Sequence, residues 1–139
     1  MSEIVVDASA LGSVLLTDEN GALGQAAVAV WGQGTVRAPA HWPVEVISIL
    51  IKAERNKRLS VAECDVAWDL AATLIQSCNV ESTTAGAPIF SLAREHGLSA
   101  QDAGYVELAA RLKVPLLTGD KAMARAARTL AVELIFDPQ

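Results

Sequence analysis

The chain has 139 residues, with 11 Lys plus Arg against 16 Asp plus Glu and a formal net charge of -5. This length predicts one domain, residues 1–139, with room for an ordinary core and no need of disulfides or structural metal. Because 52% of the residues are apolar, the chain is not expected to be disordered. The acidic balance argues against a general nucleic-acid-coating protein. It is compatible with an enzyme that acts on nucleic acid through metal ions held by its acids.

The sequence has no features of export or membrane insertion. Met1-Ser2-Glu3 is followed by a short apolar run without a basic region or a cleavage motif. The longest weakly polar stretches, such as 8–16 and 44–51, are shorter than the ~20 residues that cross a bilayer. Cys64 and Cys78 are far apart and lie in apolar helical patterns, so both are expected to be buried thiols. We therefore expect a soluble, cytoplasmic protein.

The first part of the chain predicts two strands separated by two helices. Ile4-Val5-Val6 is a β-branched run, typical of a buried strand, and it ends at Asp7. A turn-forming cluster separates two runs rich in Ala, Val and Leu. The predicted elements are a strand at 4–6, a helix at 8–16, a turn at 17–21, a helix from 22 to 31 that ends at Gly32 and Gly34, and a strand at 35–37.

Two further helices are expected in the middle of the chain. Pro39 and Pro43 mark the entry to a helix that runs to about Lys57, since proline is tolerated in a first turn. Ser60-Val61-Ala62-Glu63 is a capping-box pattern that opens a helix to about Ser77. The expected apolar face of this second helix consists of Val61, Cys64, Trp68, Ala71 and Ile75.

The last part of the chain continues the alternation of strands and helices. We expect a short strand at Val80, a helix capped by Thr83 or Thr84 that ends at His96-Gly97, a helix at 100–112 that begins at Ser99, a strand at 115–118, a helix from Asp120 to about 129, and a strand at 132–136. Strands alternating with helices predict a parallel sheet covered on both faces, a three-layer α/β fold.

Four acids fall at strand ends or helix starts, where such a fold gathers its ligands. Asp7 follows the first strand, and Asp120 follows the strand at 115–118. Asp102 and Glu45 lie in the first turns of their helices. Each acid also has a structural explanation as a cap or as a first-turn acid favoured by the helix dipole. Together on one edge they would repel one another unless a cation lay among them, and carboxylates suit Mg²⁺ or Mn²⁺.

Two hydroxyls lie close in sequence to these acids. Ser9 is two residues after Asp7, and Thr118 is two residues before Asp120. Both could orient a carboxylate or a metal-bound water. A capping role for each remains open.

Four segments, in this order and spacing, resemble the motifs of PIN-domain ribonucleases, and most of all the VapC-like toxins of VapBC toxin–antitoxin pairs. The resemblance covers 4–135. The segments are Ile4-Val5-Val6-Asp7-Ala8-Ser9-Ala10-Leu11; Ala38-Pro39 with Glu45-Val46 and Leu50; Leu98-Ser99 with Asp102-Ala103 and Tyr105; and Leu117-Thr118-Gly119-Asp120.

The resemblance implies a PIN fold and Mg²⁺- or Mn²⁺-dependent cleavage of RNA phosphodiester bonds, which would inhibit translation or growth. It assigns the catalytic quartet to Asp7, Glu45, Asp102 and Asp120, with metal held by the three aspartates and support from the hydroxyls of Ser9 and Thr118. It also implies a cognate VapB-like antitoxin and a homodimer. Two residues depart from the family pattern: Ser48, where related toxins often have Asn, and Pro43, which precedes Glu45 by two residues.

Basic and large apolar residues suggest where partners would bind. Lys121, Arg125 and Arg128 recur at helical spacing beside Asp120, and Lys121 and Arg125 are the candidates for RNA backbone contact. A second basic cluster consists of Lys52, Arg55, Lys57 and Arg58. A solvated helix face is the simpler explanation for most of these side chains. Leu15, Leu16, Trp31 and Trp42 would serve a protein interface or, more simply, the core.

Two other functional classes remain open from the residues alone. A phosphatase or phospho-acceptor on a similar sheet is weakened because Ser9 stands where haloacid-dehalogenase phosphatases have a second Asp, and because receiver domains typically pair acids at the end of the first strand. A PIN-like interaction module with an inactive site is weakened by the presence of all four acids. The sequence does not identify the general base, the number of metal ions or the RNA.

Overall fold

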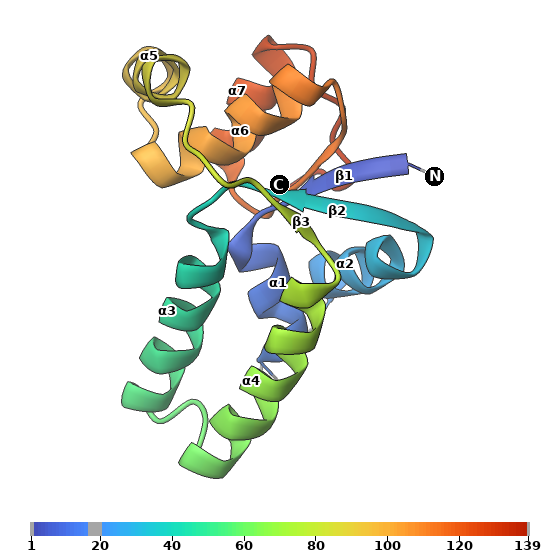
Figure 1. The fold of residues 1–139 in the computed structure, drawn as a ribbon, viewed down its shortest axis with the longest axis vertical. Helices are drawn as coiled ribbons and strands as arrows, with labels where there is room; N and C mark the ends of the chain where they lie inside the picture. The colour runs from blue at the N-terminus through green and yellow to red at the C-terminus, as the bar shows by residue number, and fades with distance from the viewer. Residues whose placement is uncertain (1, 17–20, 139) are drawn as a thin grey trace.

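The structure is a computed structural model that describes residues 2–16 and 21–138 (Figure 1). Its centre is a sheet of four parallel strands in the order β3-β2-β1-β4. The strands are β1 (Ser2–Val6), β2 (Gly34–Ala38), β3 (Asn79–Val80) and β4 (Leu116–Leu117). Val5 in the central strand pairs with Arg37 on one side and Leu116 on the other. The predicted parallel α/β sheet is therefore confirmed.

Helices cover both faces of this sheet, which gives the expected three layers. In Figure 1, α1 to α4 lie on one side of the strands and α5 to α7 on the other. The helices of the described residues are α1 (Ala8–Leu15), α2 (Ala22–Gln33), α3 (Trp42–Arg55), α4 (Val61–Gln76), α5 (Gly86–His96), α6 (Ala100–Leu112) and α7 (Lys121–Thr129).

Alternating residues of the strands supply two apolar cores. Val5 and Leu116 belong to the larger core, which includes residues of α6 and α7 and extends to α1, α3 and α4. Ile4, Val6 and Leu117 belong to a smaller core with residues of α1 and α2. Burial on both faces explains why the first strand is a continuous apolar run with no polar alternation.

The helix boundaries follow local capping chemistry in most places. Ser60 and Glu63 form the predicted capping box of α4, and Ser99 accepts a hydrogen bond from the Asp102 amide at the start of α6. Gly97 ends α5 with a left-handed φ of 65°, which glycine adopts without steric cost. Helix α2 continues through Gly32 to Gln33, and Gly34 already belongs to β2. Of the predicted turn at 17–21, only Gly21 lies within the described residues.

The predicted caps of α5 are wrong. Thr83 and Thr84 lie before the helix, and the N-cap is Ala85, whose side chain makes no capping bond. Gly86 is the first helical residue, so Pro88 occupies the third position. For a cap at position 85 the two amides to satisfy are those of Ala87 and Pro88, and the proline nitrogen carries no hydrogen, so a polar side chain there would have one amide to accept from.

The predicted strand at 132–136 forms only an isolated parallel bridge between Leu116 and Leu134. The Leu116 amide donates to the Glu133 carbonyl at 2.9 Å, and the Ile135 amide donates to the Leu116 carbonyl at 3.1 Å. Since β4 has two residues, it offers too little edge for a longer ladder.

The predicted apolar face of α4 is rotated from the real one. The buried residues of this helix are Cys64, Ala67 and Ala71, whereas Val61 is 65% and Trp68 41% exposed. Small side chains at this spacing let α4 approach α3 and α1, and the bulky Trp68 lies outside this contact. Cys64 is buried as expected, but Cys78 lies beyond the end of α4 and is only partly buried.

The core interpretation of the early apolar residues is confirmed at three positions. Leu15, Leu16 and Trp42 are at most 4% exposed. Trp31 is partly buried and stacks on Trp42 with ring centroids 6.4 Å apart. Within the described part of the chain, no helix is both long enough and apolar enough to cross a membrane.

Replacing Trp42 by Ala is expected to lower the free energy of unfolding by about 3–5 kcal/mol, because a fully buried indole would leave a cavity. Trp68→Ala is the matched control and should cost no more than about 1 kcal/mol at its exposed position. Urea denaturation of both variants measures the difference. Equal losses would contradict the described packing of α3 and α4.

Candidate active site

Asp7 occupies the junction between the central strand and α1. Its Oδ1 accepts hydrogen bonds from the Ala10 amide at 2.7 Å and the Ser9 hydroxyl at 2.8 Å, and its Oδ2 accepts one from the Thr118 hydroxyl at 2.5 Å. The residue is 3% exposed. A carboxylate offers about four acceptor positions, so these three bonds leave one, on Oδ2.

Burial makes ionisation of Asp7 costly. Desolvation raises the pKa of its carboxyl from 3.8 to about 6, although the bonds from Thr118, Ala10 and Ser9 oppose the rise. The negative charge of Asp102 adds to the increase. Asp7 is therefore both the best-anchored acid of the site and the most strained electrostatically.

Thr118 connects Asp7 to the second strand-end acid. Its hydroxyl donates to Asp7 and accepts from the Asp120 amide at 3.0 Å. Asp120 caps α7 by accepting from the Met123 amide at 2.8 Å. The hydroxyls of Ser9 and Thr118 therefore both donate directly to the Asp7 carboxylate.

Glu45 lies in the first turn of α3, where two aromatic side chains hold it. The Tyr105 hydroxyl donates to Glu45 Oε1 at 2.7 Å, and His41 Nε2 lies 3.2 Å from the same oxygen without hydrogen-bond alignment. The two rings pack edge to face, with centroids 5.1 Å apart. Burial alone would raise the pKa of Glu45, but the contacts from His41 and Tyr105 outweigh it and lower the pKa below 4.5.

Gly104 makes room for this aromatic pair. A Cβ at position 104 would lie 2.7 Å from His41 Cε1, closer than real side chains approach. The His41 ring therefore packs directly against the backbone of α6. In the sequence Tyr105 stands out only as part of a family motif, and His41 has no predicted role. The available signals were the spacing of four residues from His41 to Glu45 and a glycine next to Tyr105.

Asp102 lies in the first turn of α6 and is partly buried. Desolvation raises the pKa of its carboxyl, and the nearby charges of Asp120 and Glu45 raise it further. Asp102 thus interacts electrostatically with each of the other three acids, Asp7, Asp120 and Glu45, at one edge of the sheet. The charge of Asp102 makes ionisation of Asp7 harder, and the charges of Asp120 and Glu45 make ionisation of Asp102 harder.

The donor chemistry of this edge fits a hard divalent cation. Carboxylate oxygens are the preferred ligands of Mg²⁺ and Mn²⁺, Asp7 keeps one acceptor position, and a cation would offset the repulsion that raises two of the pKa values. Within residues 2–16 and 21–138, no three acidic, His or Cys side chains are already arranged around a single ion position. The side chains would therefore have to close around an ion.

The basic residues predicted beside the site are at the surface. Lys121 and Arg125 are exposed on α7, one turn apart, directly after Asp120. Arg128, the third residue of that series, pairs with Asp137.

Comparison with known proteins supports this interpretation. The PIN domain family matches residues 4–129. The chain is 36% identical over 125 residues to Ribonuclease VapC3 from two Mycobacterium tuberculosis strains, CDC 1551 / Oshkosh and ATCC 25618 / H37Rv, and the match covers 89% of this chain and 87% of each relative.

Solved structures share the fold at lower identity. PAE2754 from Pyrobaculum aerophilum superposes with a TM-score of 0.73 at 20% identity, covering 96% of this chain and 91% of that one. FitAcB from Neisseria gonorrhoeae superposes with a TM-score of 0.60 at 18% identity, covering 97% of both chains.

The fold and the acidic edge define a three-layer α/β domain of the nuclease type. The chain belongs to the PIN-domain family, and within it to the VapC-like ribonucleases. This membership favours the ribonuclease over the phosphatase that the residues alone left open.

Replacing Asp7 by Asn is expected to stabilise the metal-free protein at neutral pH. The folded pKa of Asp7 is raised from 3.8 to about 6, which corresponds to about 3 kcal/mol as an upper bound. Below the unfolded pKa this cost is absent, and it grows as the pH rises through the folded pKa. The amide fits because Thr118 can accept from it and donate to Met123 Sδ, 3.7 Å away.

Thermal unfolding of wild type and Asp7→Asn in chelator, from about pH 4 to about pH 7.5, measures this difference. The advantage of the variant should increase between about pH 4 and pH 6 and stay constant above. A variant that is less stable than wild type at every pH would contradict the described burial of Asp7.

Proposed function

We propose that the chain is a divalent-metal-dependent endoribonuclease, the toxin of a toxin–antitoxin pair, which hydrolyses RNA phosphodiester bonds and so inhibits translation or growth. One observation carries the proposal: four acids from four separate segments interact electrostatically at the carboxyl edge of the sheet. The relationship to a protein named Ribonuclease VapC3 supports RNA as the substrate.

Asp7, Asp102 and Asp120 would hold Mg²⁺ or Mn²⁺, with Glu45 beside them. The cation, when bound, supplies positive charge that lowers the pKa of water and stabilises charge on the phosphate. Ser9 and Thr118 fix the Asp7 carboxylate, and Thr118 also fixes the backbone of Asp120. Lys121 and Arg125 would contact the RNA backbone next to the scissile phosphate.

Glu45 is the best candidate for the general base. Its lowered pKa keeps it ionised at neutral pH, and Tyr105 and His41 both approach Oε1. In the part of the chain that the structure describes, Oε2 is therefore the oxygen left to accept the proton of an attacking water.

A cognate VapB-like antitoxin and a homodimer complete the proposal, with action in the cytoplasm. Pull-down of a co-expressed antitoxin and a measured mass in solution test these two partners. An inactive PIN-like interaction module is the competing function.

RNA cleavage tests the proposal directly. Wild type should cleave RNA with Mg²⁺ or Mn²⁺ and lose activity in chelator, whereas Asp120→Asn should be at least about 100-fold slower because it removes a charge at the reacting centre. Mapping the cleaved ends in total RNA identifies the site. If wild type and variant give equal products with and without metal, a contaminating nuclease is the source of the cleavage. This outcome would favour the inactive PIN-like interaction module.

Tyr105→Phe should lower kcat about 10-fold or more with little change in KM. It removes the hydroxyl that donates to the Glu45 carboxylate and accepts from the Ala8 backbone, and bonds to charged groups contribute about 1.5–3 kcal/mol. In a Glu45→Gln background the same change should have almost no further effect. A full additional loss there, with unfolding unchanged, would show that Tyr105 does not act through Glu45.

A further inference from the structure

Several basic side chains of the described residues are engaged in ion pairs and therefore cannot serve RNA freely. Arg37 pairs with Glu3 and Glu81, and Arg111 pairs with Glu81 and Glu107. The densest remaining basic segment is the end of α3 and the residues just after it. Lys52, Arg55 and Lys57 are all exposed there.

Two cavities adjoin this basic segment. One, of about 230 Å³, lies between α1 and the second half of α3 and is lined by Ser9, Lys52, Asn56 and Arg58, among others. The other, of about 420 Å³, contains Glu45 and Ser48. Ile49 and Lys52 line both cavities. The two cavities therefore form adjoining parts of one groove along α3, with Lys52 where they meet.

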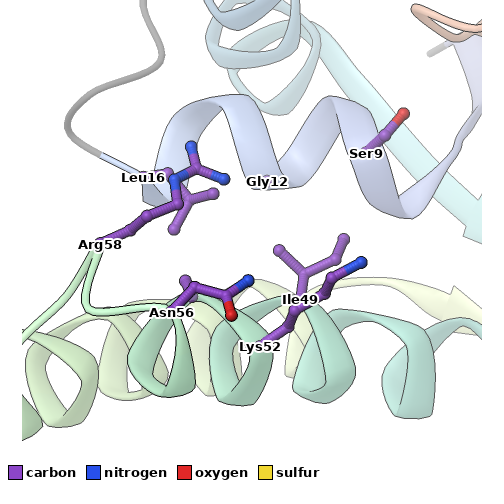
Figure 2. Close-up of a pocket in the computed structure, with 8 residues that line it drawn as sticks. Ser9, Gly12, Leu16, Ile49, Lys52, Asn56 and Arg58 are labelled. Atoms are coloured by element: carbon purple, nitrogen blue, oxygen red, sulfur yellow. The ribbon is translucent and has the colours of Figure 1, made fainter.

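Figure 2 shows how the side chains surround the first cavity. Ile49, Lys52 and Asn56 rise from the end of α3 toward α1, and Arg58 reaches toward the end of α1 from the loop that follows. Ser9 lies at the opposite end on α1, and Gly12 between them presents no side chain (Figure 2). The Ser9 hydroxyl donates to Asp7, so this end of the cavity reaches the acidic site.

The groove changes charge along its length. Glu45 lines the second cavity, Lys52 stands where the two cavities meet, and the Asn56 amide lines the first. From Glu45 to Lys52 the helix rises about 10 Å, the length of about three stacked nucleotides of one strand. A polyanion whose reacting phosphate lies at the acids would place a flanking phosphate beside Lys52.

We propose that the groove between α1 and α3 is a subsite for the RNA backbone, in which Lys52 neutralises a phosphate that flanks the scissile bond. The inference rests on the proposed ribonuclease function and adds where the substrate strand runs. The amide of Asn56 is a neutral donor for phosphate or ribose oxygens, whereas the Ser9 hydroxyl, whose hydrogen is donated to Asp7, can only accept from a ribose hydroxyl. A single-stranded segment fits better than a duplex, because the first cavity lies between α3 and α1, the second lies between α3 and the start of α6, and both are small.

Variants that replace a lysine by glutamine remove one positive charge and test the subsite without disturbing the helix, since Gln and Lys have similar helix propensity. Lys52→Gln is compared with Lys113→Gln, an exposed lysine just before Pro115 at the opposite edge of the sheet. Binding of a short, labelled, single-stranded RNA of mixed sequence is measured by anisotropy across a salt series, in an Asp120→Asn background that prevents cleavage. Cleavage by the otherwise wild-type chains is measured in parallel.

Lys52→Gln should reduce the slope of log K against log salt concentration by about 0.7, so that binding is about 5-fold weaker at about 0.1 M salt and nearly equal at about 1 M. KM should rise with kcat unchanged, and Lys113→Gln should match its parent in both assays. If wild type cleaves RNA but Lys52→Gln leaves the salt dependence of RNA binding unchanged, the subsite is overturned and the proposed function stands. Wild type that neither binds nor cleaves RNA overturns both.

A protein partner in the groove is the other outcome to be separated. Poly-glutamate peptide is titrated against the same variants. A loss of peptide binding in Lys52→Gln, with RNA binding unchanged, overturns the RNA subsite in favour of an acidic protein segment.

Discussion

The hydroxyl of Thr118 is the contact on which the arrangement of the site depends. It donates to the buried carboxylate of Asp7 and accepts from the backbone of Asp120. Because β1 and β4 are parallel neighbours with Val6 opposite Leu117, Asp7 and Thr118 leave the sheet side by side. Sheet register therefore places the first two acids together, and no long loop has to be ordered to do so. The remaining acids come from helices that pack over this edge.

Burial of the Asp7 carboxylate at this contact lowers the stability of the fold. Asp7 is almost completely buried and its pKa is raised to about 6, so ionisation at neutral pH opposes folding. Three hydrogen bonds offset only part of this cost. A cation at the edge would favour the ionised forms of Asp7 and Asp102 together. Such a site would be most stable when a cation is bound, and metal binding would then be linked to the stability of the domain.

The parts of the fold that could be predicted are those set by local chemistry. The apolar run before Asp7, the capping box at Ser60 and the glycine after His96 each fix an element within a few residues. Two of the errors arose where a tertiary contact decided the outcome. The face of α4 depended on how closely small residues allow α3 to approach, and the strand at 132–136 depended on the two-residue length of β4.

The site shows the same division. Asp7, Asp102, Asp120 and Glu45 could be selected because strand ends and helix starts are visible in the sequence. The hydrogen bond that supports Glu45 could not be predicted, since Tyr105 is 60 residues from Glu45 along the chain. This bond exists only after α6 packs against α3. The close fit of His41 over Gly104 is likewise a product of that packing.

Helix α3 shows why the basic segment could not be interpreted from sequence. Glu45 lies in its first turn, and Lys52 and Arg55 lie in its last turn. This polarity is the one that the helix dipole favours, worth about 0.3–1 kcal/mol for each charge. It is also the polarity that the proposed substrate path would use, with a carboxylate at the proposed reacting centre and an ammonium farther along the helix. Helix stability and substrate binding therefore both explain the same residues at these positions. Only the cavities beside α3 and the position of Ser9 at the acidic site distinguish the two explanations.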